Sequence, residues 1–363
     1  MKECLLYKKL DREIVQCQTC AHQCVILPRH RGICGVRENQ SGRLYLLVYG
    51  KAISENVDPI EKKPLFHFLP GTQSLSIATA GCNFRCANCQ NADISQASKE
   101  GLEATNRSFQ RTATLMKFGK AAQENFFENK TIPGQDLPPE KVVHDAKNSG
   151  CPSISYTYTE PTIFLEYALD CMKLAKKNGL KNVWVSNGYQ TPQTIKLIAP
   201  YLDAINIDLK SYRDDSYLKN CGAHLQPVLD SLILMKKSRI WVEVTTLIIP
   251  EFNDSEKELQ DIANFIFKKL GKETPWHISK FYPAYRLPGT PETPIETIHK
   301  ACKIGKSADL KYVYAGNIPG DEYENTYCPK CHKLCIERLG YEMQRFDKQG
   351  KCPKCETDLN IIE

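Results

Sequence analysis

Three cysteines, Cys82, Cys86 and Cys89, follow directly after an apolar run that ends at Ala80. Thiolates from one short loop can wrap a cubane iron–sulfur cluster, whereas a closed structural metal site needs a fourth ligand. The C-x3-C-x2-C spacing therefore predicts a 4Fe-4S cluster with one iron left open to another molecule. A zinc-binding loop, or three structural thiols in a turn, is the alternative, although neither needs this position after a strand.

Two C-x2-C pairs stand near the end of the chain: Cys328 with Cys331, and Cys352 with Cys355. This arrangement is typical of a zinc ribbon or a rubredoxin-like site. Tetrahedral sulfur ligation admits zinc, which makes such a module structural, or iron, which makes it a one-electron relay. We favour zinc, and we interpret the neighbouring His332 and Cys335 as incidental.

A third group, near the N-terminus, consists of Cys17, Cys20, Cys24 and Cys34. Four cysteines so close in sequence predict a fourfold metal site. Zinc and a second 4Fe-4S cluster fit the spacing equally well. His22 is an alternative ligand, but we expect this side chain to face solvent.

The chain has 17 cysteines in 363 residues. Most of the six outside these three groups are interpreted as buried thiols that behave like small apolar side chains: Cys4, Cys151, Cys171, Cys221, Cys302 and Cys335. A reducing compartment makes disulfides a poor use for so many thiols, so metal binding is the natural alternative. No stretch reaches the roughly 18 apolar residues of a membrane span. The first residues also lack the apolar core of a secretory signal. We therefore expect a cytoplasmic protein without a membrane partner.

Short β-branched or aromatic runs alternate with segments of helical periodicity from about residue 74 to residue 315. The predicted strands are Ser74–Ala80, Ser153–Thr159, Asn182–Gly188, Ala204–Leu209, Ile240–Ile249 and Trp276–Pro283. The predicted helices are Thr162–Asn178, Thr191–Tyr201, Leu225–Lys237, Ser255–Leu270 and Pro294–Ser307. This alternation predicts an α/β fold with a parallel sheet and right-handed crossovers, a partial (β/α)6 TIM-like barrel.

The predicted organisation has three parts. Residues 1–72 form an N-terminal Cys-rich metal-binding region, residues 73–315 the barrel, and residues 316–363 the zinc-ribbon or rubredoxin-like module. A polar stretch at about 96–139, with a helical patch at Thr112–Phe127, interrupts the barrel and is either a lid over the active site or a surface insertion.

Polar side chains recur where the predicted strands end, and active sites of parallel α/β barrels gather at that face. The candidates are Tyr158, Glu160, Ser186, Asn187, Asp208, Lys210 and Thr245. Glu243, Thr246 and His277 lie on the later strands and have looser assignments. A carboxylate such as that of Glu160 can accept hydrogen bonds from an ammonium group, and Lys210 can neutralise a carboxylate.

The loop from Gly81 to Asn91 closely resembles the signature of the radical S-adenosylmethionine (SAM) superfamily. The resemblance implies that the open iron is chelated by the amino and carboxylate groups of SAM. It also implies that an electron from the reduced cluster cleaves SAM to a 5′-deoxyadenosyl radical, which removes a hydrogen atom from a substrate. Asn88 stands where the superfamily usually has an aromatic residue near the adenine.

The strand-end residues extend this resemblance to a radical SAM oxidoreductase of the pyruvate formate-lyase activating enzyme type. Glu160 matches the acidic residue of the Gly-Gly-Glu-Pro motif that binds the methionyl amine, with Tyr158 and Thr159 in place of its two glycines. Ser186 and Asn187 resemble a Thr-Asn-Gly segment that reaches SAM. Asp208 to Lys210 resembles an Asp-Leu-Lys motif.

Over nearly the whole chain, the sequence is similar to the AmmeMemoRadiSam system radical SAM protein. The resemblance is carried by Asp58–Gly71, Gly81–Asn91, Tyr156–Thr162, Glu243–Pro250 and Gly316–Cys328, with Gln96–Lys130 as a stretch that looks inserted. It implies Memo-like and AMMECR1-like partner proteins, and an electron donor such as ferredoxin or flavodoxin.

Two other functions compete with a radical enzyme acting on an unknown substrate. A glycyl-radical enzyme activase would install the radical in a partner protein. A multi-zinc nucleic-acid-binding protein would use the three cysteine groups as fingers. The net charge of +6, from 48 basic and 42 acidic residues, is small and spread along the chain, which argues against a nucleic-acid partner.

Overall fold

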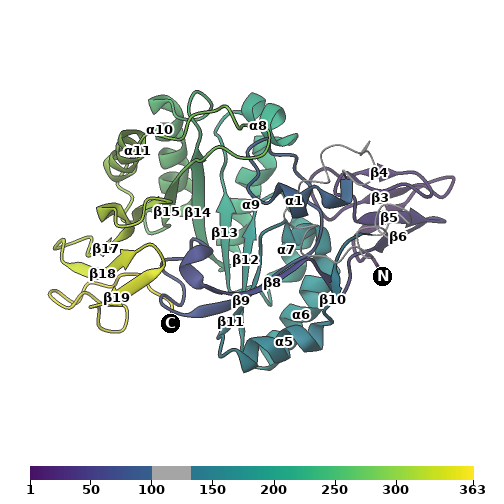
Figure 1. The fold of residues 1–363 in the computed structure, drawn as a ribbon, viewed down its shortest axis with the longest axis horizontal. Helices are drawn as coiled ribbons and strands as arrows, with labels where there is room; N and C mark the ends of the chain where they lie inside the picture. Colours follow the sequence, from purple (N-terminus) through teal and green to yellow (C-terminus); the bar gives the residue numbers. More distant parts are fainter. Residues whose placement is uncertain (100–131) are drawn as a thin grey trace. The chain divides into compact units, whose positions relative to one another are not determined.

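The computed structural model describes residues 1–99 and 132–363, which are drawn in colour in Figure 1. These residues fall into two compact units. Unit 1 comprises Met1–Val57 and Ser74–Asp203, and unit 2 comprises Asp58–Gln73 and Ala204–Glu363. The predicted helical patch at Thr112–Phe127 lies outside the described residues, as does most of the predicted insertion. The three-part organisation predicted from the sequence stays a prediction.

The main sheet of unit 1 has parallel strands β9 (Gln73–Ala78), β11 (Ser153–Tyr156) and β12 (Lys181–Ser186), with β11 in the middle. Strand β8 (Ser54–Pro59) follows β9 in the strand order. The helices of unit 1 are α1 (Ala92–Ser95), α5 (Pro139–Asn148), η3 (Pro161–Phe164), α6 (Leu165–Lys177) and α7 (Pro192–Ile198). The Thr191 side chain caps α7 by accepting from the Thr194 N–H.

Small antiparallel sheets, drawn in purple in Figure 1, build the N-terminal part of unit 1. One contains β1 (Lys2–Glu3), β6 (Arg43–Leu46) and β5 (Arg37–Gln40), with β6 in the centre. A second contains β2 (Tyr7–Lys9), β3 (Val15–Cys17) and β4 (Val25–Ile26). Strand β7 (Lys51–Ala52) pairs with β10 (Gln135–Asp136). These short strands hold the loops that carry the N-terminal cysteines.

Unit 2 contains four parallel strands in sequence order: β13 (Ala204–Asp208), β14 (Trp241–Ile248), β15 (Trp276–Lys280) and β16 (Val313–Gly316). Its helices are α8 (Asp214–Cys221), α9 (Leu225–Lys237), α10 (Glu256–Phe265), the π-helical η4 (Ile266–Leu270) and α11 (Ile295–Ser307). Gly222 ends α8 in the left-handed conformation at φ 68°, which glycine adopts without steric cost.

The end of the chain adds a three-stranded antiparallel sheet to unit 2, coloured yellow in Figure 1. It consists of β17 (Thr326–Tyr327), β18 (Leu334–Leu339) and β19 (Glu342–Arg345), preceded by η5 (Glu322–Glu324). The segment Asp58–Gln73, with η1 (Ile60–Lys62), also belongs to this unit.

All six predicted strands are present, and each ends one to three residues earlier than predicted. The predicted helices are present too, although Thr162–Asn178 divides into the 3-10 helix η3 and α6, and Ser255–Leu270 divides into α10 and η4. Strand β16 and helices α5 and α8 were not predicted, because short elements give too few periods to recognise. In the part of the chain that the structure describes, no helix is long and apolar enough to cross a membrane.

Candidate active site and metal centres

The central cysteine loop begins just beyond β9. Cys86 is buried, Cys82 and Cys89 are half-buried, and none of the three is in a disulfide. The Phe84 N–H donates to the Cys82 Sγ at 3.4 Å, and the Cys89 Sγ lies 3.3 Å from the Ser95 hydroxyl. Burial raises the pKa of Cys82, so a thiolate here needs a cationic partner such as iron.

The carboxylate of Glu160 is the centre of a hydrogen-bond network at the ends of β11 and β12. It is buried, and one oxygen accepts from the Thr162 N–H at 3.0 Å, the Thr162 hydroxyl and the Ser186 hydroxyl at 2.9 Å. The other oxygen accepts from the Asn187 N–H at 2.8 Å. Burial raises the pKa of Glu160, and these donors oppose that rise. A carboxylate oxygen has two acceptor positions, so the second oxygen can take a further donor such as an ammonium group.

Asn187 connects this network to the cysteine loop. Its side-chain amide donates to the Asn83 Oδ1 at 2.7 Å and lies 4.0 Å from the Cys82 Sγ. The Asn187 Oδ1 accepts from the Tyr189 N–H at 3.2 Å. Residues from two strand ends and from the loop thus share one network within unit 1.

Tyr158 occupies the left-handed region at φ 63°, a conformation that glycine adopts far more readily. Its carbonyl accepts from the Asn91 side chain at 2.9 Å, and the Thr159 hydroxyl donates to the Thr79 carbonyl at 2.9 Å. This conformation gives a physical reason for a glycine at the matching position of the Gly-Gly-Glu-Pro motif. The tyrosine keeps the turn at the expense of backbone strain.

The predicted residues Asp208, Lys210 and Thr245 lie together in unit 2. The Lys210 ammonium is 2.7 Å from the Asp208 carboxylate, and both side chains are partly exposed. The Lys210 N–H donates to the Tyr217 hydroxyl at 2.9 Å. The Thr245 hydroxyl donates to Asn206 at 2.9 Å. The structure therefore groups the predicted residues as two sets, one in each unit.

Glu243 has a structural environment inside unit 2. Its buried carboxylate accepts from the N–H groups of Phe66 and His67, at 3.0 and 2.9 Å. The Trp241 indole donates at 2.9 Å, and the His277 Nε2 lies at 2.6 Å. Burial alone would raise the pKa of Glu243, but the contacts with His277 and the other donors lower it overall. The two backbone hydrogen bonds, from Phe66 and His67, hold the segment Asp58–Gln73 against β14. Thr246 also has a structural hydrogen bond, since its hydroxyl accepts from the Trp276 indole at 3.0 Å.

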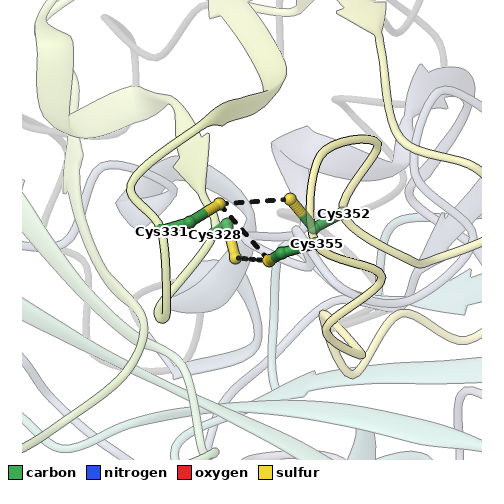
Figure 2. A group of neighbouring side chains, drawn as sticks. All are labelled: Cys328, Cys331, Cys352 and Cys355. Atoms are coloured by element: carbon green, nitrogen blue, oxygen red, sulfur yellow. Dashed lines mark hydrogen bonds between the residues drawn. The ribbon is translucent and has the colours of Figure 1, made fainter.

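The C-terminal cysteines converge on one point (Figure 2). The Sγ atoms of Cys328 and Cys355 are 3.5 Å apart, those of Cys331 and Cys352 are 3.5 Å apart, and those of Cys331 and Cys355 are 3.3 Å apart. Hydrogen bonds from Thr357 lower the pKa of Cys355 to about 6, which suits a thiolate ligand. Among the described residues this is the one group of three or more Cys, His, Asp or Glu ligand atoms that gathers within 4.8 Å.

The N-terminal cysteines Cys17, Cys20, Cys24 and Cys34 line one small cavity of about 20 Å³. Asn83, from the central cysteine loop, lines the same cavity. The structure thus brings the four thiols of this group around a common space.

His22 does not simply face solvent, as expected from the sequence, but is half-buried. Its Nε2 lies 2.9 Å from the Asn83 carbonyl, and its ring packs against Tyr189 and Phe84 with centroids 4.8 and 6.4 Å away. Sequence analysis missed Asn83 and this role of His22, because both depend on contacts between distant parts of the chain.

Residues 76–266, more than half of the chain, match the sequence profile described as the radical SAM superfamily. The chain belongs to this superfamily. An uncharacterized protein of Methanocaldococcus jannaschii is similar at 43% identity over 365 residues, which cover 100% of both chains. The pyruvate formate-lyase-activating enzyme of Clostridium pasteurianum is 22% identical over 197 residues, 54% of this chain and 70% of that one. Streptococcus suis SuiB bound to precursor peptide SuiA aligns with a TM-score of 0.47 at 10% identity, covering 72% of this chain and 52% of that chain.

The radical SAM superfamily implies a 4Fe-4S cluster and SAM, and the residues present fit both groups. The three cysteines of the central loop form no disulfide and could supply cluster ligands, and N–H and hydroxyl groups lie near two of their sulfurs. The Glu160 carboxylate retains an acceptor position for an ammonium group.

Proposed function

We propose that this radical SAM protein cleaves SAM reductively and uses the resulting radical to abstract hydrogen from a substrate. The observation that carries the proposal is the network that joins Cys82 and Asn83 to Asn187, and Asn187 to Glu160. It ties the predicted cluster loop to the predicted ligand of the methionyl amine. Cys82, Cys86 and Cys89 would hold the cluster, which when bound and reduced supplies the electron that cleaves SAM.

The chain's own residues have distinct tasks in this proposal. Glu160 accepts a hydrogen bond from the methionyl ammonium, while Thr162 and Ser186 hold its carboxylate in place. Asn187 fixes the position of the loop through its contact with Asn83. The other predicted SAM contacts rest on the sequence resemblance alone: Tyr158, Ser186, Asn187, Asp208, Lys210 and Thr245.

We further propose that the protein works within the AmmeMemoRadiSam system, with Memo-like and AMMECR1-like partners and a donor such as ferredoxin or flavodoxin. The resemblance of residues 58–71 and 316–328 supports this assignment. All seventeen cysteines lie among the described residues and none is in a disulfide, which agrees with a reducing, cytoplasmic setting.

A glycyl-radical activase is the second candidate, because the relative from Clostridium pasteurianum is named as the activating enzyme of pyruvate formate-lyase. The two functions differ in where the radical ends. An activase leaves an organic radical on a partner protein that electron paramagnetic resonance (EPR) detects after reaction. A small-molecule enzyme leaves no such signal.

The proposed function is tested by EPR of the anaerobically reconstituted, reduced protein before and after SAM is added. An open iron that binds SAM changes the cluster signal, and we expect this change in the wild type. Replacing all three central cysteines by alanine should remove the signal that responds to SAM. A wild-type spectrum that is unaffected by SAM would contradict the proposal.

A further inference from the structure

The cavity of the N-terminal cysteines is built from separate short elements of unit 1. Cys17 ends β3, Cys20 lies in the turn that follows, Cys24 immediately precedes β4, and Cys34 lies shortly before β5. Cys17 and Cys34 are buried, whereas Cys20 and Cys24 are half-buried. All four side chains line the same small space, so they can share one metal group.

The spacing of these thiols differs from that of the C-terminal group. Four thiolates around one zinc ion lie about 3.8 Å apart, given Zn–S bonds of about 2.3 Å and tetrahedral geometry. The C-terminal sulfurs match this distance, with separations of 3.3 to 3.5 Å. In the described part of the chain, no three N-terminal thiols gather within 4.8 Å in the same way. A cubane needs the wider arrangement, because each thiolate binds a different iron at a different corner.

Asn83 supplies a second, independent indication of a ligand in this cavity. The residue is 1% exposed, and its Oδ1 already accepts from Asn187. Its Nδ2 is buried and has no hydrogen-bond partner among the described residues. A buried N–H group is costly unless it is paired, and the sulfurs of a cluster are suitable acceptors. Asn83 lines the cavity with the four thiols, so a cluster there would satisfy it.

The cavity also adjoins the central cysteine loop. A Cβ at Gly81 would lie 2.8 Å from the Cys34 carbonyl oxygen, so the two backbones are in close contact. Ser98 donates its hydroxyl to the same carbonyl at 2.9 Å, and His22 contacts the Asn83 carbonyl at 2.9 Å. The loop that carries Cys34 and the central cysteine loop are therefore in direct contact.

We propose that Cys17, Cys20, Cys24 and Cys34 hold a second 4Fe-4S cluster, which passes electrons to the cluster of the central loop. Four thiolates cover all four irons, so this cluster has no open iron for SAM and is restricted to electron transfer. A low-potential one-electron carrier reduces it by one electron. It is reoxidised when that electron moves to the central cluster, and no bond forms or breaks. The transfer step rests on the proposed function, whereas the metal assignment does not.

Metal and sulfide analysis of full-length, anaerobically prepared protein tests the assignment. The wild type should contain about eight irons, because each cubane has four. The triple variant Cys82→Ala, Cys86→Ala, Cys89→Ala should keep about four irons and four sulfides. The double variant Cys20→Ala, Cys24→Ala should also keep about four, now in the central loop. Zinc in place of iron in the triple variant, or four irons in the wild type, would overturn the assignment.

The transfer step has its own measurement. Stopped-flow measurements follow the reduction of the central cluster by a one-electron carrier protein. This reduction should be at least tenfold slower in the Cys20→Ala, Cys24→Ala variant than in the wild type. The SAM-induced change of its central EPR signal should persist. Reduction at an unchanged rate would overturn the relay. The two proposals can fail separately. If the triple variant keeps its four irons, but the wild type and the Cys20→Ala, Cys24→Ala variant both fail to respond to SAM, the assignment of the second cluster stands and the proposed function fails.

Discussion

The carbonyl oxygen of Cys34 lies against Gly81 so closely that a Cβ at position 81 would be 2.8 Å from it. Gly81 also has φ 102°, a conformation that other residues rarely adopt. The residue before Cys82 is therefore fixed by both sterics and backbone conformation. This contact places Cys34, one of the four N-terminal cysteines, beside the central loop.

Gly81→Ala should lower the iron content of the central loop and destabilise the protein, because a methyl group cannot fit beside Cys34. The matched control is Gly150→Ala, where φ is 67° but no atom lies within 4 Å of the new Cβ. The control variant should lose only about 1–2 kcal/mol of unfolding free energy, which is the cost of an alanine in the left-handed conformation. Iron per chain and the free energy of unfolding measure both effects. Equal losses in the two variants would show that the Cys34 contact is unimportant.

Glu160→Gln should weaken SAM binding and reduce stability by about 1–3 kcal/mol, because the new NH2 group faces a donor instead of accepting from it. The wild-type carboxylate accepts from Thr162, Ser186 and Asn187. Glu140→Gln, at an exposed position in the first turn of α5, is the control; it should leave SAM affinity unchanged and cost less than about 1 kcal/mol of stability. Titration calorimetry with SAM and denaturant unfolding give the two readouts. Unchanged SAM affinity would exclude Glu160 as a ligand.

Lowering the pH should destabilise unit 2 through His67. Burial lowers the pKa of His67 to about 4, and its ring lies between the Leu359 carbonyl at 3.0 Å and the Tyr314 hydroxyl at 2.6 Å. Between pH 6.5 and 4 the unfolded chain binds the proton that the folded chain excludes, so stability is full above pH 6.5 and falls toward pH 4. The loss is roughly 3 kcal/mol over this window. His67→Gln should flatten this dependence in denaturant unfolding at several pH values, whereas exposed His144→Gln should keep the wild-type slope.

The C-terminal group should bind one zinc per chain. Cys331→Ala combined with Cys355→Ala should release it, because two of four thiolates are lost. Cys335→Ala is the control, since its Sγ contacts the Lys333 carbonyl and it is not one of the four converging cysteines. Elemental analysis measures the result. Retention of zinc in the double variant would contradict the assignment. Iron instead of zinc at this site in the wild type would identify a rubredoxin-like centre.

The parts that sequence predicted well are those that depend on local patterns. The radical SAM family, the gathering of the paired C-x2-C motifs and the six strands were each predicted from residues close together in the chain. The roles of Asn83 and His22, and the contact of Gly81 with Cys34, depend on long-range packing that no local spacing encodes. Tyr158 is intermediate, because the glycine pattern marked the position, but only the structure revealed the positive φ that explains it.

Formation of 5′-deoxyadenosine tests the central claim most directly. Anaerobically reconstituted protein, given dithionite and SAM, should produce it, and Cys86→Ala should abolish the product by removing a cluster ligand. Cys151→Ala, a buried free thiol outside the three groups, should retain wild-type yield. Undiminished 5′-deoxyadenosine from Cys86→Ala, or none from a wild type that carries its full iron content, would contradict the account.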